Sequence, residues 1–170
     1  MANQQFTDAI ALLKADHRKV EDLFEQFEKA GSSARKKTLA REICLELKIH
    51  TMIEEDIFYP AFRGKIEDDT LDEAYVEHDG AKLLVNDIEE GDPSDDFFDA
   101  KVKVLSEEIK HHVHEEEMRG EGMFAQCRKT DVNLVQLRDA MLARKEKLLK
   151  EAENGGLPPA RPRVIQLVPA

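Results

Sequence analysis

The chain has 170 residues, a length that suits one domain with a substantial apolar core, and its composition is 41% hydrophobic and 36% charged. The formal net charge is −11, which argues against sequence-independent binding to nucleic acid or to an anionic membrane. No apolar run approaches the roughly 20 residues of a membrane span, and the first residues lack the basic start and apolar stretch of a signal peptide. Cys44 and Cys127 have neither disulfide nor zinc spacing, so we expect free thiols and a cytoplasmic protein.

Four long amphipathic helices are predicted, over residues 7–30, 33–63, 68–91 and about 94–118. Asp8 can cap the first helix by accepting an amide hydrogen of the first turn, and Gly31 suits the position after its end. Pro60 should bend or end the second helix, because proline lacks the amide hydrogen and clashes with the preceding turn. Pro93 fits the first turn of the fourth helix, where that hydrogen is not needed.

The chain after the fourth helix is less regular. The segment 119-RGEG-122 contains two glycines, which cost about 2 kcal/mol inside a helix relative to alanine, so a break is predicted there. A shorter fifth helix follows over residues 131–152, and four of the six prolines lie beyond it. We therefore expect an all-α protein: an up-down-up-down four-helix bundle with an additional C-terminal helix over residues 1–152, and an irregular, proline-rich tail over residues 153–170.

Polar residues interrupt the apolar stripe of every long helix. In the first helix, the residues at spacings of three and four are Ile10, Leu13, His17, Val20, Phe24 and Phe27. In the second helix they are Ile43, Leu47, His50, Glu54, Ile57 and Ala61. In the third they are Leu71, Ala74, His78, Ala81, Val85 and Ile88, and in the fourth Phe98, Val102, Leu105, Ile109, His112 and Glu116. Four histidines and two glutamates are therefore expected inside the bundle.

In the segment 111-HHVHEEE-117, helical periodicity predicts which polar side chains face the core and which do not. His112 and Glu116 continue the apolar stripe of their helix. His111 and Glu115 are rotated by about 100° from them, so we expect them at the border, behind the inward-facing pair. The remaining two polar side chains are expected at the surface: His114 and Glu117.

A single metal centre explains the six buried polar residues better than six separate hydrogen-bonded residues. A buried carboxylate destabilises a protein unless it is paired or bound to a cation, although one buried histidine alone usually has a protein partner. Residues four apart share a helix face, so two His-x-x-x-Glu pairs can offer imidazole and carboxylate to one site. Carboxylates can bridge two ions, and mixed imidazole and carboxylate ligands favour iron, with manganese or zinc as alternatives. The predicted metal residues are His17, His50, Glu54, His78, His112 and Glu116.

Four segments carry a resemblance to a known family: 12-LLKADHRKVEDLFEQFE-28, 46-ELKIHTMIEEDIFYPAF-62, 77-EHDGAKLLV-85 and 110-KHHVHEEE-117. In this order they resemble the hemerythrin-like, or HHE cation-binding, domain over about residues 6 to 150. The resemblance implies a non-haem di-iron centre with an oxygen-derived bridge. It also implies that the six residues named above are the metal ligands and that Glu54 and Glu116 bridge the two irons.

One departure from the family concerns the third helix. Hemerythrins that carry oxygen reversibly have a second histidine there, at H-x-x-x-H spacing, whereas the positions four residues from His78 are Ala74 and Lys82. One iron is therefore expected to be more open, or to take Glu77, Glu55 or water as a ligand. This difference argues against simple oxygen carriage and favours redox reactivity.

A second departure follows the fourth helix. Family members continue into M-F-P, whereas this chain has EEEMRGEGMFAQ, with Ala125 in place of the proline. We expect a bulge just past Glu116 that loosens this ligand. Tyr59 lies one turn past Glu54 and could hydrogen-bond near the site, but we favour packing at the helix end with its hydroxyl toward solvent or backbone.

Three functions remain open from the sequence. The first is a di-iron protein that binds or senses dioxygen, nitric oxide or iron. The second is a di-iron enzyme that acts on peroxide, as a catalase or peroxidase does, and the third is a metal-free structural bundle. The expected partner is a small molecule, without nucleic acid or membrane, and the protein is expected to be a monomer or a homodimer.

Overall fold

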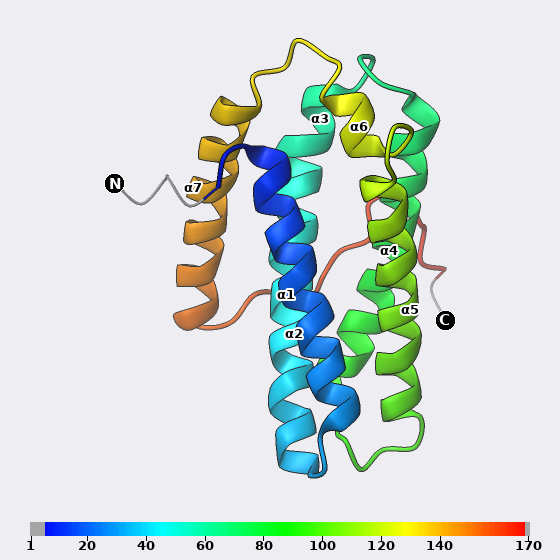
Figure 1. The fold of residues 1–170 in the computed structure, drawn as a ribbon. Helices are drawn as coiled ribbons and strands as arrows, with labels where there is room; N and C mark the ends of the chain where they lie inside the picture. Colours follow the sequence, from blue (N-terminus) through cyan, green and yellow to red (C-terminus); the bar gives the residue numbers. More distant parts are fainter. Residues whose placement is uncertain (1–5, 169–170) are drawn as a thin grey trace.

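The computed structural model describes residues 6–168, and all regular secondary structure within them is helical. Four long helices form the bundle: α1 (Ala9–Lys29), α2 (Ser33–Ile53), α4 (Asp68–Glu90) and α5 (Phe98–Glu117). Successive long helices run in opposite directions, and α7 (Leu134–Glu153) packs outside the bundle against α1 and α2 (Figure 1). The predicted all-α class is confirmed, and the helix order agrees with an up-down-up-down bundle. No helix among the described residues combines the length and apolar character needed to cross a membrane.

Helix starts follow local capping. The carboxylate of Asp8 accepts the amide hydrogen of Ala11 at 2.9 Å, and Ser32 caps α2 in the same way. The fourth long helix, in contrast, begins at Phe98 rather than near residue 94 as predicted. Asp92 accepts hydrogen bonds from both the amide and the hydroxyl of Ser94, which forms a turn that competes with a helical start.

The second helix contains a π turn just before Pro60. In this turn, η2 (Glu54–Phe58), the amide of Tyr59 donates to the carbonyl of Glu54 five residues back, and a short helix, α3 (Tyr59–Phe62), follows. The extra residue shifts the buried face. Between Glu54 and Phe62 the buried aromatic residues are Phe58, Tyr59 and Phe62, whereas the predicted Ile57 and Ala61 are only partly buried.

Two apolar clusters fill the bundle, one on each side of the polar residues. One cluster lies toward the α1–α2 turn and includes Phe24, Leu47 and Val85. The other lies toward α6 (Met123–Cys127) and α7 and includes Leu13 and Phe58. The predicted polar residues occupy the layer between the two clusters. Cys44 and Cys127 are buried free thiols, as expected, and burial raises the pKa of each to about 12.

The predicted break after α5 is present and requires glycine at one position. Gly122 donates its amide hydrogen to the carbonyl of Met118 at 3.0 Å. A side-chain carbon at Gly122 would lie 2.7 Å from the carbonyl oxygen of Glu115, closer than real contacts allow. This tight loop leads into α6, which the sequence did not predict, and places Phe124 against the polar layer.

The tail after Glu153 is irregular, as predicted, and lies against α4. The side chain of Asn86 pairs with both the amide and the carbonyl of Ala160. The buried carboxylate of Asp79 accepts the amide hydrogens of three successive residues, at 2.6 to 2.9 Å: Arg163, Val164 and Ile165. Of the ranges expected for bundle and tail, residues 1–5 and 169–170 lie outside the described part of the chain.

Candidate metal centre

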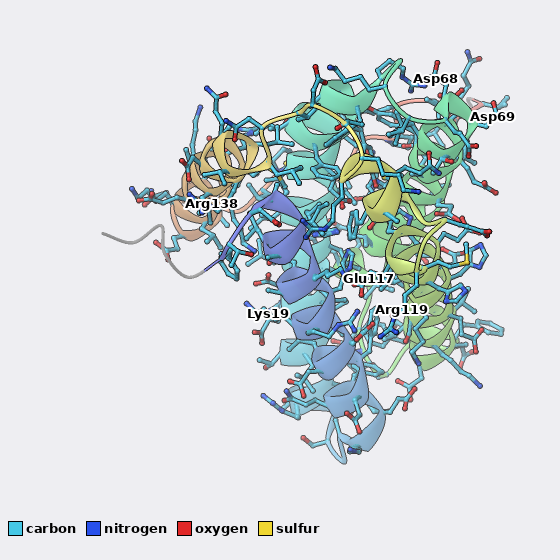
Figure 2. The ribbon with its side chains drawn as sticks, turned by 45° about the horizontal axis from the view of Figure 1, so that its top comes forward. Lys19, Asp68, Asp69, Glu117, Arg119 and Arg138 are labelled. Carbon is cyan, nitrogen blue, oxygen red and sulfur yellow. The ribbon has the colours of Figure 1, made fainter. Side chains whose placement is uncertain are left out.

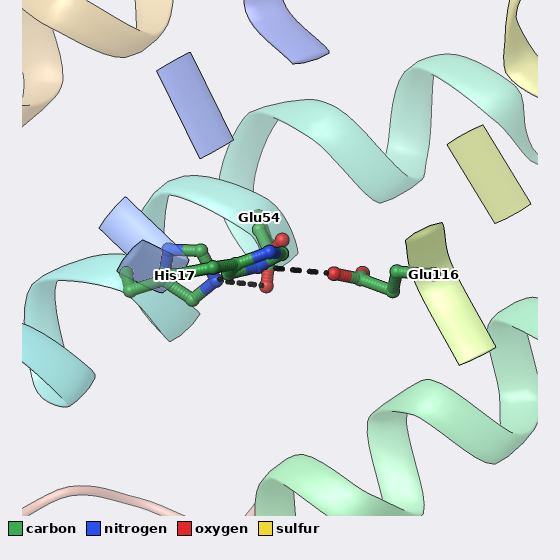
Figure 3. Close-up of side chains that lie close together, drawn as sticks. His17, Glu54 and Glu116 are labelled. Carbon is green, nitrogen blue, oxygen red and sulfur yellow. Dashed lines mark hydrogen bonds and ion pairs between the residues drawn. The ribbon is translucent and has the colours of Figure 1, made fainter. Parts of the chain in front are cut away.

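The structure brings all six predicted metal residues together in the middle layer. Each long helix contributes at least one, and none is more than 6% exposed: His17, His50, Glu54, His78, His112 and Glu116. In Figure 3 the side chains of His17, Glu54 and Glu116 point toward one another from α1, η2 and α5. The arrangement is therefore a convergent site inside the bundle.

The four histidines form two pairs that face each other through Nε2 atoms. The Nε2 atoms of His17 and His50 lie 3.2 Å apart, and those of His78 and His112 lie 3.1 Å apart. We refer to these as the His17/His50 half and the His78/His112 half of the centre. Each half offers two imidazole nitrogens to the same small volume.

Two carboxylates join the halves. One oxygen of Glu54 lies 3.2 Å from the Nε2 atoms of both His50 and His78. Glu116 approaches His17 at 3.3 Å with one oxygen and His112 at 3.5 Å with the other. Both carboxylates are therefore in position to bridge two ions.

Each histidine has a second carboxylate at its other ring nitrogen, Nδ1. The Nδ1–O distances are 2.7 Å for His17–Glu117, 3.5 Å for His50–Asp16, 3.0 Å for His78–Glu55 and 2.6 Å for His112–Glu77. Three of these contacts are hydrogen bonds, whereas the longer His50–Asp16 contact is not. A carboxylate hydrogen-bonded to Nδ1 fixes a proton there and orients Nε2 toward the centre. This is the usual arrangement of metal-binding histidine.

The pKa values show how strongly the centre attracts positive charge. Burial by itself lowers the pKa of His50, but Glu54 and Asp16 raise it to about 10. Burial acts in the same direction on His78, and Glu54 and Glu55 raise its pKa to about 9. Burial favours the neutral form of Glu54, yet the two histidines beside it hold the pKa of Glu54 well below its usual range.

The donor set fits bound cations. Oε1 of Glu54 is buried without a hydrogen-bond partner among the described residues, a costly state for a carboxylate, and Oε2 of Glu116 has only the His17 imidazole near it, at 3.3 Å without hydrogen-bond geometry. The Nε2 atoms of the four histidines face these carboxylates in one small volume, and a bound cation would replace the protons that the histidines otherwise hold there. Two groups have ligand atoms within 4.8 Å of one another: His17, His50, Glu54 and Glu116, and Glu54, His78 and His112. Nitrogen and oxygen donors without thiolate suit iron, manganese or zinc.

Tyr59 lies inside this centre, so the favoured prediction that its hydroxyl would face solvent or backbone is wrong and the alternative, a hydrogen bond near the site, holds. The residue is fully buried, and its hydroxyl lies 2.9 Å from Glu116, 3.2 Å from Glu54 and 3.2 Å from Nε2 of His78. The π turn explains the difference, because its i to i+5 hydrogen bond brings Tyr59 onto the face that Glu54 occupies. In a regular α-helix, with 3.6 residues per turn, the side chain of Tyr59 would point away from the metal centre. Proline directly after a tyrosine in the helix is the signal that could have found it.

Three further expectations are corrected. Glu55 and Glu77 do not fill the place of the missing histidine, because each binds the Nδ1 atom of a histidine from behind. Glu117 is not a free surface residue: it is partly buried between α1 and α5 and binds His17 (Figure 2). Glu116 is not loosened, since α5 remains helical through Glu117 and the break begins after it.

Comparison with known proteins identifies the family. The sequence pattern of the Hemerythrin HHE cation binding domain matches residues 8–124, well over half of the chain. The chain belongs to this family of cation-binding domains. A solved structure, a Hemerythrin HHE cation binding domain-containing protein from Mycobacterium kansasii, superposes with a TM-score of 0.71 and 22% identity. The match covers 89% of this chain and 96% of that one, and it supports the fold.

One curated relative is longer. A protein from Nostoc sp. named DNA nickase is 27% identical over 106 residues, which are 62% of this chain and 30% of the relative. The chain thus spans about a third of that protein. The family match shows a metal-binding domain, and the four helices supply the His and Glu residues that can hold the metal.

Proposed function

We propose that this protein holds two iron ions in the middle layer of the bundle and uses them to bind or sense a small ligand such as dioxygen or nitric oxide. The observation that carries the proposal is the symmetry of the donor set. Two pairs of Nε2 atoms are joined by two carboxylates that each approach both halves. Di-iron carboxylate sites in helical bundles use donors of this kind.

Each residue has a defined part in this proposal. His17 and His50 would hold one ion, His78 and His112 the other, and Glu54 and Glu116 would bridge them. A bound iron pair supplies reversible electron transfer and binding of small oxygen or nitrogen species. The carboxylates at the Nδ1 atoms orient the imidazoles and increase their basicity.

The enclosed surroundings of the metal centre favour the binding of a small ligand over that of a larger substrate. The six donors and Tyr59 are at most 6% exposed, and two apolar clusters enclose them. The Tyr59 hydroxyl lies in the His78/His112 half, which is the half without the second histidine of oxygen-carrying hemerythrins. We infer that Tyr59 supplies a hydrogen bond or an oxygen ligand there.

The test is metal stoichiometry followed by spectroscopy. Elemental analysis of protein purified from iron-supplemented cells should give about two iron ions per chain. Reduced protein exposed to dioxygen, and separately to nitric oxide, should then show a reversible change in its visible spectrum. Fewer than one bound metal ion per chain, or spectra unaffected by both gases, would contradict the proposal.

Reaction with peroxide is a second candidate, favoured by the buried Tyr59 hydroxyl. The Tyr59 hydroxyl donates a hydrogen bond to Glu116, and burial together with the two carboxylates raises its pKa, so the phenol keeps its proton and can donate a hydrogen bond to peroxide inside the centre. Oxygen evolution after addition of hydrogen peroxide measures this activity directly. Fast evolution that stops when iron is removed would favour the enzyme over the sensor.

A further inference from the structure

Three of the four carboxylates behind the histidines are balanced by a permanently charged cation. Glu117 pairs with Arg18 at 2.8 Å, Asp16 pairs with Lys145 of α7, and Glu55 pairs with Lys82 and with Arg163 of the tail. On these three sides the carboxylate behind the histidine is thus neutralised by an ion pair. A metal ion that approached from those sides would meet a lysine or an arginine.

Glu77, behind His112, differs from the other three. Among the described residues it has no lysine or arginine within ion-pair distance. Its inner oxygen binds Nδ1 of His112 at 2.6 Å, and its outer oxygen lies 3.3 Å from Nε2 of His111. His111 is exposed and also lies 3.2 Å from Glu115. One carboxylate thus contacts both the buried centre and an exposed group of polar side chains.

Glu77, His111 and Glu115 have the composition of a metal site. They offer one imidazole nitrogen and two carboxylate oxygens within 4.8 Å of one another. Two carboxylates and a neutral imidazole carry net negative charge, which a divalent cation balances. Nitrogen and oxygen donors suit Fe²⁺, Mn²⁺ or Zn²⁺, and the open side toward solvent leaves room for bound water.

We propose that Glu77, His111 and Glu115 form an outer binding site for a divalent metal ion, from which the ion passes inward to His112 along Glu77. The outer site stands independently, whereas its role in loading rests on the proposed metal centre. The geometry follows from the sequence. Glu77 precedes His78 on α4 and His111 precedes His112 on α5, and one step rotates a residue by about 100° around its helix. The same two helices therefore present one pair inward and another pair outward.

The electrostatics of this face agree with a cation site. Glu108 lies near enough to Glu77 that its pKa is raised, mainly by burial and further by the charge of Glu77. The α4–α5 face therefore carries carboxylates without a lysine or arginine partner among the described residues, whereas the carboxylates on the other three sides of the centre are paired with cations. A negatively charged rim raises the local concentration of cations and the rate at which they associate.

A titration of metal-free protein with Zn²⁺, a redox-inert probe, tests the site by calorimetry. We expect strong binding at the inner centre and one further, weaker equivalent per chain. The double substitution His111→Ala with Glu115→Gln should abolish the weaker equivalent and keep the strong ones. His114→Ala, which removes another exposed imidazole from α5, is the matched control and should keep all of them.

Loading kinetics test the role of the site. Stopped-flow uptake of Fe²⁺ should be about tenfold slower in the double variant than in the wild type or in His114→Ala, with the same final iron content. A weaker equivalent that is missing from the wild type, or that survives the double substitution, overturns the outer site.

The remaining outcomes separate the two proposals. Loss of the weaker equivalent without a change in the uptake rate supports the outer site and overturns its role in loading. Absence of the strong equivalents from the wild type overturns the proposed function. The outer site is then supported if the weaker equivalent still depends on His111 and Glu115.

Discussion

In the His17/His50 half of the centre the Nε2 atoms face each other and the carboxylates of Glu54 and Glu116, whereas in the His78/His112 half they also face the hydroxyl of Tyr59. The first half is closed from outside by two ion pairs, Arg18–Glu117 and Lys145–Asp16. The second half has one carboxylate, Glu77, that leads out to an exposed histidine.

This difference suggests that the two halves of the centre have different roles. The enclosed half, with fixed charges behind both histidines, suits an ion that stays in place. The other half has a phenol beside its nitrogens and an acidic path to solvent, which suits exchange of ligands and of metal. Some residues contact both halves of the centre and others contact only one. Substitutions in each kind of residue can test whether the two halves bind metal independently.

Glu54→Ala should have the largest effect, because Glu54 is the carboxylate that approaches His50 and His78 equally at 3.2 Å. We expect metal content to fall from about two ions per chain to less than one, since both halves lose a donor. Elemental analysis measures it. Glu107→Ala, at an exposed position of α5, is the control and should keep both ions. Two ions retained in Glu54→Ala would show that the halves do not share this residue.

His112→Ala removes a donor from one half only. Metal content should fall by about half, because the His17/His50 half keeps both imidazoles and both carboxylates. The same elemental analysis, combined with titration of the metal-free variant, measures this. Unchanged metal content would mean that His112 is not a ligand, and complete loss would mean that neither half holds an ion alone.

Gly122→Ala should destabilise the protein by about 1–3 kcal/mol, the usual range for inserting atoms into a well-packed region. The added carbon would lie 2.7 Å from backbone atoms of Glu115 and Met118. The Gly122 loop also places Phe124 in a parallel stack on the ring of His17, with ring centres 5.9 Å apart. Urea unfolding measures the change. Gly155→Ala has open space around it and should match the wild type.

Metal-free protein should lose stability as the pH rises from 7 to 8.5. In the folded state the pKa values of His50 and His78 are about 10 and about 9, above the ordinary value of 6.5. Both therefore keep a proton in this window while the unfolded chain has lost it, so the free energy of unfolding falls with pH. Urea unfolding at several pH values measures the slope. His50→Gln and His78→Gln should each reduce this slope, one from each half, and a flat profile in the wild type would refute the assignment.

Tyr59→Phe should have the smallest effect on metal content and on stability. The ring remains to fill the core, so we expect both iron ions to stay bound and stability to change little. Loss of the hydroxyl from the His78/His112 half should remove any phenolate-to-iron band from the visible spectrum and alter the response to peroxide. Tyr75→Phe is the matched control, because the Tyr75 ring packs on Tyr59 at 5.3 Å without a hydrogen bond to the centre. Identical spectra for Tyr59→Phe and the wild type would limit Tyr59 to packing.

The sequence alone predicted where the polar layer would lie. His17, His78 and His112 each replace an apolar residue in a stripe of period 3.6, and such a register is a local property of each helix. The same register separated His112 from His114, which is exposed in the structure. Because an α-helix has one fixed rotation per residue, these positions needed no knowledge of the other helices.

Tertiary structure decided the features that break this regularity or join distant segments. Tyr59 reaches the centre only because a π turn inserts one residue of rotation before it. Arg163 meets Glu55, and Lys145 meets Asp16, across more than a hundred residues of chain, and no local pattern encodes such contacts. The sequence therefore determined which face of each helix carries the ligands. The packing of helices and tail determined which charges stand behind each histidine, and left Glu77 with an exposed histidine as its outer partner.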